Sequence, residues 1–362
     1  MNDLLHTIPS PDPLPVASGW FLFLSYLTYY LHLLGVGVLF GAAVSAALGY
    51  FKGQSDSTWK AFGDRMAKVV PFGIAFAVNL GVAPLLFIQV LYGNFFYTAS
   101  ILLGIPWIFI VLFIIIAYYS SYWTVFKKES TVKTKTLFSV IVSIILAWTA
   151  FMLVNVNTLT ITPAKWKTYF AHKSGFNLNV SETTLFPRYI FYLFLFLCIG
   201  GMFIALFYRM KIKREESSTG LNFGSILSGY SGFLAVPAFV LFILTLPAGI
   251  KSVFLGGNLL WTILLPVFVL GLMVTGYLNF KRKTALSALL LVIDLAVFVL
   301  IRNHIRYLYL KPFEEKFSGV AQNTQYGVMV LFFIILAGGL GLVAWLLVKV
   351  ARETKSTGPV GT

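Results

Sequence analysis

Asp294 is a carboxylate near the middle of an apolar stretch, LLLVIDLAVFVLIRNHIRYLYL (residues 289–310), which predicts one long helix. About ten residues separate it from either end of a membrane-length helix, so a rise of 1.5 Å per residue places it roughly 15 Å from each interface. An aspartate at that depth costs about 2.5–3.5 kcal/mol on insertion scales, so we expect it to face protein and either to find a partner on another helix or to stay protonated. It is then either a neutral carboxyl group that ties helices together or a group that handles protons or binds a ligand.

A second group of polar side chains gathers toward one end of the predicted helices. Arg302, His304 and Arg306 follow Asp294 on its own helix, and amide side chains occur on other apolar stretches. Such donors suit the ring oxygens of a quinone or a polar lipid head group, whereas the plainer interpretation is snorkelling arginines beside a belt of interfacial tyrosines. The sequence predicts a quinone site built from Asn79, Gln89, Asn155, Arg302, His304 and Arg306, with Asp294 and His32 as the catalytic groups that accept quinol protons.

Histidine and cysteine are too few for most redox centres. His32 and His304 are the only two histidines that could face each other across a haem b, but their depths match poorly, so we expect no haem b. His6 and His172 lie outside the apolar stretches. Cys198 is the single cysteine and there is no C-x-x-C-H, so we expect no covalent haem, disulfide or thiolate metal site. His32 is then either a hydrogen-bonded packing residue or part of a quinone or proton site.

The elements that must position these residues are membrane-spanning helices. Of 362 residues, 59% are hydrophobic and only 11% are charged, against about 25% charged in a typical soluble domain. Several apolar runs exceed the roughly 20 residues that cross a bilayer as a helix. The fold class is therefore all-α, a polytopic membrane protein whose nine predicted spans cover about 20–50, 69–92, 100–123, 136–157, 188–208, 225–248, 258–280, 285–305 and 326–349.

Charge predicts the orientation in the membrane. Loops on one side carry 18 of the 27 Lys and Arg residues, and loops on the other side carry nine. The richer side is cytoplasmic by the positive-inside rule, which leaves the N-terminus outside and the C-terminus inside. The same bias accounts for most of the net charge of +15, so no nucleic-acid partner is expected. We expect the first span to be retained, because residues 1–17 are polar and proline-rich and lead directly into it.

The two halves of the chain resemble each other. YLHLLGVGVLFGAAVSAALGYFK (30–52) is similar to YLFLFLCIGGMFIALFYRMK (192–211) in its opening, its glycines and its basic end. We expect two four-helix units related by an axis along the membrane normal, followed by one added helix. The predicted divisions are an extracytoplasmic segment (1–19), the first unit (20–157), an extracytoplasmic loop (158–187), the second unit (188–305), a second such loop (306–325), the ninth helix (326–350) and a cytoplasmic tail (351–362).

Small residues predict where helices approach one another closely. In the first span they recur every four residues along one stripe, at Gly37, Gly41, Ser45 and Gly49. Such a stripe lets a second backbone come near and indicates packing, not a substrate path. The same interpretation applies to three glycines of the ninth span, Gly338, Gly339 and Gly341.

Three segments suggest a family. They are NLGVAPLLFIQVLYGNFFYTASILLGIPW (79–107), YYLHLLGVGVLFG (29–41) and VLIRNHIRYLYLKPF (299–313), which resemble polytopic membrane subunits that accompany multihaem c-type cytochromes in bacterial respiratory clusters. The four-plus-four layout is also similar to quinol-binding membrane subunits of the polysulfide reductase type. These resemblances imply a bacterial inner-membrane subunit that binds quinone, associates with other membrane subunits and docks an extracytoplasmic cytochrome, although fold analogy assigns no site.

Three functions fit these features. The first is a respiratory membrane subunit, either quinol-oxidising or quinone-reducing, in which quinone binds near the outer leaflet and an external c-type cytochrome exchanges the electrons. The second is a proton-coupled secondary transporter that uses Asp294, although few other polar groups are predicted at its depth. The third is a structural membrane anchor for cytochromes, which needs no chemistry in this chain. The sequence favours the first, because it accounts for the polar cluster and for the scarcity of redox ligands.

Overall fold

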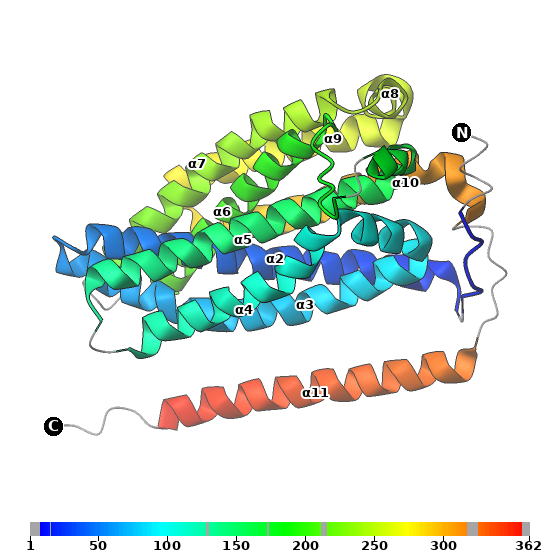
Figure 1. The fold of residues 1–362 in the computed structure, drawn as a ribbon. Coiled ribbons are helices and arrows are strands. Elements are labelled where there is room, and N and C mark those ends of the chain that lie inside the picture. The colour runs from blue at the N-terminus through cyan, green and yellow to red at the C-terminus, as the bar shows by residue number, and fades with distance from the viewer. Residues whose placement is uncertain are drawn as a thin grey trace.

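A computed structural model of the chain describes residues 8–14, 16–127, 130–171, 174–210, 216–316 and 325–356, and it is a bundle of helices (Figure 1). Within these ranges, nine helices are long and apolar enough to cross a membrane, as the sequence predicts. They are α2 (Ser18–Lys52), α3 (Ser57–Leu103), α4 (Ile105–Phe126), α5 (Val132–Ile161), α6 (Leu185–Met210), α7 (Glu216–Leu244), α9 (Leu259–Phe280), α10 (Thr284–Leu310) and α11 (Tyr326–Ser356).

Shorter helical segments connect the ends of these helices. They are η1 (Pro163–Ala171), α8 (Ala248–Ser252), the π-helical turn η2 (Val253–Gly257) and η3 (Lys311–Lys316). His6 and His172 lie outside the described residues, as do parts of the predicted N-terminal segment, second external loop and cytoplasmic tail.

The longest helix, α3, extends beyond the predicted second span in both directions. It begins at Ser57, where the side chain of Asp56 accepts backbone hydrogen bonds from the first turn. It bends at Tyr92, whose backbone is non-helical, and ends at Leu103, just before Gly104, whose φ of 68° favours glycine. The predicted span 69–92 covers only its middle. The residues before it are largely polar, whereas those after the bend are largely apolar and overlap the predicted third span from residue 100.

Small residues lie where α2 crosses α6 and where α2 crosses α3. A Cβ atom added at Gly41 of α2 would collide with the backbone of Gly200 in α6, so these two helices touch at the centre of the bundle. Gly49, farther along the same stripe of α2, meets Gly63 of α3 in the same way. The prediction that this stripe serves helix packing is confirmed.

The α6–α7 pair resembles the α2–α3 pair in its packing. Gly201 of α6 and Gly224 of α7 approach each other so closely that a Cβ atom on either would meet the other helix's backbone, as at Gly49 and Gly63. The tandem duplication and the division of the chain into units stay predictions.

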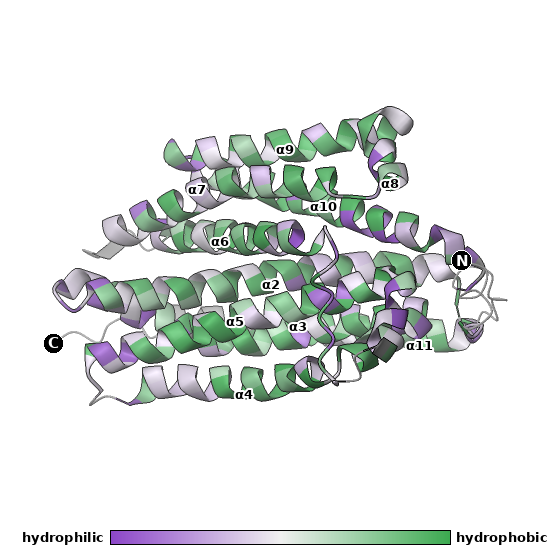
Figure 2. Ribbon diagram, turned by 45° about the horizontal axis from the view of Figure 1, so that its top comes forward, coloured by the Kyte–Doolittle hydropathy of each residue, from purple (hydrophilic) through white to green (hydrophobic). Residues whose placement is uncertain are grey.

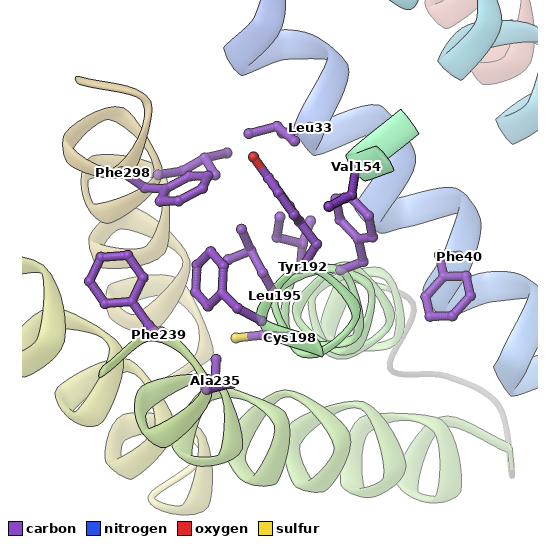
Figure 3. Packing of buried hydrophobic residues seen from close by; sticks show 14 of the residues in the cluster. Leu33, Phe40, Val154, Tyr192, Leu195, Cys198, Ala235, Phe239 and Phe298 are labelled. Atoms are coloured by element: carbon purple, nitrogen blue, oxygen red, sulfur yellow. The ribbon is translucent and has the colours of Figure 1, made fainter. Parts of the chain in front are cut away.

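Aromatic side chains fill the space between α6 and its neighbours. Figure 3 shows Leu195 and Cys198 of α6 packed toward Phe239 of α7 and Phe298 of α10. The ring of Phe191, also on α6, lies 5.0 Å from Phe239 and 4.9 Å from Phe298, measured between ring centroids. This core holds the middle of α10, one turn beyond the carboxyl group of Asp294.

The ninth helix, α11, lies alongside the bundle with few contacts to it (Figure 1). Its membrane-spanning part is not buried inside the described structure, and Trp20 of α2 meets Phe333 at 5.3 Å between ring centroids. The prediction that its glycines serve packing is wrong for this chain's own described helices, since a Cβ atom at Gly338, Gly339 or Gly341 would meet no atom within 4 Å.

One end of the bundle carries η1 and η3, and we call it the outer end because the charge distribution predicts it to be extracytoplasmic; the opposite end is the inner end. Hydrophilic residues gather toward both ends of the helices (Figure 2). At the outer end the ring of Phe95 lies 6.2 Å from Trp166 and 5.9 Å from Phe313, and Ile8 of the N-terminal segment is buried in the same cluster. These contacts close the outer end over the polar residues below.

Candidate functional site

The polar residues that follow Asp294 divide between two faces of α10. An α-helix turns about 100° per residue, so Arg302 and Arg306 lie about 40° apart while His304 lies about 160° from each. The arginines face the interior of the bundle. His304 faces the N-terminal end of α9. The sequence placed all three in one quinone site, and the structure brings only the two arginines together.

The arginine face of α10 meets an amide from α5. Arg302 Nη2 and Arg306 Nη2 donate to Asn157 Oδ1 at 3.1 and 3.3 Å. Arg302 Nη1 donates to Asn303 Oδ1 at 3.0 Å. Arg188, near the start of α6, lines the same cavity and is as deeply buried as Arg306, at 5% and 4% exposed. We call Arg188, Arg302 and Arg306 the arginine cluster.

Aromatic rings lie beneath each guanidinium group of the cluster. The guanidinium carbon lies 4.3 Å from the ring centroid of Tyr29 for Arg302, 5.4 Å from Tyr92 for Arg306 and 4.7 Å from Phe242 for Arg188. These are cation–π contacts, which stabilise a cation where water is scarce. Two of the rings come from α2 and α3, so the cluster joins both halves of the chain.

The cavity beside the arginine cluster is narrow. Its empty volume is about 320 Å³ when its open side is included, but the space that a water molecule can enter is only about 10 Å³. Its apolar walls are formed by Ile161, Phe191, Phe242, Phe298 and Ile305. A cavity this small holds about one water molecule and excludes a flat ring system.

His304 belongs to an aromatic group on the other face of α10. Its ring stacks on Trp261 with centroids 3.9 Å apart and planes 12° apart. Phe254 and Tyr307 lie 6.0 Å away on either side. The imidazole is partly exposed, and neither ring nitrogen has a hydrogen-bond partner among the described residues. Exposed leucines, including Leu255 at 55% and Leu260 at 57%, border the group, so it opens toward lipid.

Asp294 is sheltered by protein, as its cost in lipid predicts. The residue is 2% exposed and lies against Gly271 of α9, where a Cβ atom would collide with the carboxyl group. Thr275, one turn along α9, faces the same carboxyl group, yet Asp294 Oδ2 has no hydrogen-bond partner in the described structure. Gly271 therefore makes the space that the carboxyl group occupies.

Buried polar side chains continue from Asp294 toward the inner end of α9 and α10. Asn279 Nδ2 donates to Ser228 Oγ at 2.9 Å, and Ser228 Oγ lies 3.5 Å from Cys198 Sγ. On the α10 side, Ser287 Oγ donates to Thr275 O at 3.0 Å. The sequence did not predict this row, because serine, threonine and asparagine in apolar stretches have no periodicity of their own.

His32 and the amides of α3 lie apart from both groups. His32 Nδ1 lies 3.0 Å from Ala77 O, and its ring packs on Gly81, so it faces α3 and not Asp294. Asn79 is exposed and donates to Ala75 O one turn earlier in its own helix. These contacts are those of packing and lipid-facing residues, although the predicted roles are untested.

Asn155 and Gln89 also lie outside the two groups. Asn155 is fully buried, and its Oδ1 accepts a hydrogen bond from Asn179 N at 3.0 Å, which fastens the external loop to α5. Gln89 is partly exposed on α3. Sequence reasoning does not assign Arg188 to the site, because it stands at the first position of the predicted span 188–208, where an arginine is expected to be a solvated charge.

Among the described residues, no three His, Cys, Asp or Glu side chains gather closely enough to hold a metal ion. No protein-family profile and no curated protein sequence matches the chain. Its fold is similar to that of a solved bd oxidase from Geobacillus thermodenitrificans, with a TM-score of 0.68 and 13% sequence identity over 93% of this chain and 98% of that one. The likeness shows a shared fold. At this identity it assigns no residue a role.

Proposed function

We propose that the chain is a quinone-binding membrane subunit of a respiratory electron-transfer complex, with the quinone ring held at His304. The observation that supports this most directly is the partly exposed imidazole, which stacks on Trp261 and whose nitrogens have no hydrogen-bond partner among the described residues. The bd oxidase fold adds support, because it belongs to a redox protein of the membrane.

The His304 group has the properties that a quinone requires. A quinone ring is flat and neutral, accepts hydrogen bonds through its oxygens and carries an apolar tail that stays in lipid. Stacked aromatic rings suit the flat ring, the imidazole supplies a donor, and the exposed leucines beside it suit the tail. The arginine cavity is too narrow for a ring and carries three charges, so it is the poorer candidate.

Asp294 is the proton carrier in this proposal. Reduction or oxidation of a quinone moves protons as well as electrons, and a carboxyl group buried in the membrane interior needs polar neighbours to exchange them. The row from Cys198 to Asn279 supplies such neighbours on the inner side. Protons would therefore pass between Asp294 and the inner end, and His32, which faces α3, takes no part.

Replacing His304 by leucine is expected to weaken quinone binding by about tenfold or more, because the substitution removes both the hydrogen-bond donor and the stacked ring. Titration of the purified protein with a short-chain quinone, followed by calorimetry, measures the change. Asn79→Leu is the matched control: the sequence assigns Asn79 to the same site, but the structure places it on the exposed side of α3. Equal affinity of His304→Leu and the wild type would exclude the site.

An external cytochrome is the proposed partner for the electrons. Purification from native membranes under mild conditions, followed by a redox spectrum and identification of the bound chains and quinone, tests this directly. A copurifying c-type cytochrome together with bound quinone supports the proposal. Cytochrome without quinone favours a structural anchor, and a colourless single chain without quinone favours proton-coupled transport through Asp294.

A further inference from the structure

The arginine cluster concentrates positive charge where the described structure provides little to balance it. Arg188, Arg302 and Arg306 line one cavity, and neither salt bridge found in the described residues includes any of them. Glu182, a carboxylate whose charge acts on Arg188, is already paired with Lys165 at 2.9 Å. The three guanidinium groups repel one another. Because guanidinium groups are always charged, loss of protons cannot relieve this repulsion.

Several donors of the cluster also lack acceptors. Arg188 Nε, Arg188 Nη2 and Arg306 Nε are buried, and no residue in the described part of the chain accepts a hydrogen bond from them. Asn157 Oδ1 is a single acceptor that Arg302 and Arg306 already share. A buried cation is tolerated when it is both paired and hydrogen-bonded, and here both conditions are only partly met.

We propose that the cavity of the arginine cluster binds a phosphate group, either free or as part of an anionic lipid head group. A phosphate has several acceptor oxygens for the unpaired donors of α6 and α10, and guanidinium forks bind such oxygens in pairs. The cavity in its present shape holds about one water molecule, so the three arginine side chains move apart to admit the phosphate. The walls formed by Phe191, Phe242 and Phe298 keep water away, which strengthens charge-assisted bonds.

This site is independent of the proposed quinone site. The arginine cluster and His304 lie on opposite faces of α10, and the cluster draws its other residues from α5 and α6 while His304 draws its neighbours from α9 and the turn before it. A variant of the cluster is therefore expected to leave quinone affinity unchanged, and a variant of His304 is expected to leave phosphate binding unchanged.

Thermal unfolding of delipidated protein in detergent tests the proposal. The probes are inorganic phosphate, phosphatidylglycerol and phosphatidylcholine at matched ionic strength, and native mass spectrometry counts bound lipid. We expect phosphate or phosphatidylglycerol to raise the unfolding temperature of the wild type, and Arg188→Met to weaken that binding at least about tenfold because it removes charge-assisted hydrogen bonds. Arg188→Lys, which keeps the charge but loses the fork, should bind at an intermediate strength.

The control is Lys251→Met, because Lys251 is an outer-end cation that donates to Leu244 O at 3.2 Å and does not line the cavity. A response to inorganic phosphate identifies the free anion as sufficient, whereas a response to phosphatidylglycerol alone identifies a lipid head group; both uphold the proposal. It is overturned if neither probe stabilises the wild type, if phosphatidylcholine stabilises it equally well, or if Arg188→Met responds as strongly as Lys251→Met.

Discussion

Replacing Asp294 by asparagine is expected to lower quinol turnover by about a hundredfold or more, because general acid–base groups contribute on that scale. Asparagine keeps nearly the same shape beside Gly271, so the packing of α9 against α10 should survive. Unlike the carboxyl group, the asparagine amide cannot release and rebind a proton. Quinol-dependent reduction of an external acceptor by the purified complex measures the effect, and thermal unfolding shows whether the variant is folded.

The matched control is Asp64→Asn. Asp64 Oδ1 lies at the inner end, where it accepts hydrogen bonds from Tyr50 Oη at 2.9 Å and Lys135 Nζ at 3.0 Å. Its loss should affect turnover little, since it is partly exposed and its hydrogen-bond partners do not belong to the polar row. Turnover that stays normal in folded Asp294→Asn protein would show that the carboxyl group only ties helices together.

Replacing Gly200 by leucine is expected to cost about 3 kcal/mol or more of stability, at or beyond the usual range for overpacking. Gly200 meets the backbone of Gly41, so a side chain there has no flexible neighbour to displace and the two helices must separate. Separation would also disturb the 2.8 Å hydrogen bond between Tyr29 and Tyr192, which joins the same helices nearer the outer end. Size-exclusion profiles and the unfolding temperature in detergent report the loss.

Gly339→Leu provides the comparison for that experiment. A Cβ atom at Gly339 meets nothing within 4 Å, so the same added volume on α11 should leave the unfolding temperature unchanged. If both variants unfold at the wild-type temperature, the close crossing of α2 and α6 does not contribute to stability.

Most of the fold could be predicted from the sequence, because a helix that crosses lipid needs an apolar run of sufficient length. Apolar runs of sufficient length gave nine spans, and the cost of a charge in lipid predicted that Asp294 faces protein. What hydropathy cannot see is the part of a helix outside the lipid, so α3 begins at Ser57 and not near residue 69. A stripe of small residues shows that a helix can pack closely, but it does not show that a partner helix is present. The stripe of α2 therefore meets other helices, whereas the glycines of α11 meet none of the described helices.

The candidate site was only partly accessible, because it depends on how each helix is rotated. The angular separation of Arg302 and His304 follows from their spacing, and it would have divided the predicted quinone site into two faces. The burial of Arg188 does not follow from any local pattern, since an arginine at the start of a span is usually a solvated loop charge. The neighbours of Asp294 come from α6 and α9, whose relative depth no single segment encodes.

The isolation of α11 bears on how the chain is inserted and assembled. A segment that touches the rest mainly through Trp20 and Phe333 adds little cooperativity, so eight helices should unfold as one body while the ninth stays inserted as an autonomous anchor. Severing it would alter retention in the bilayer more than the melting of the remainder. Its free flanks are also the part of the polypeptide that a neighbouring subunit could cover without displacing any internal contact.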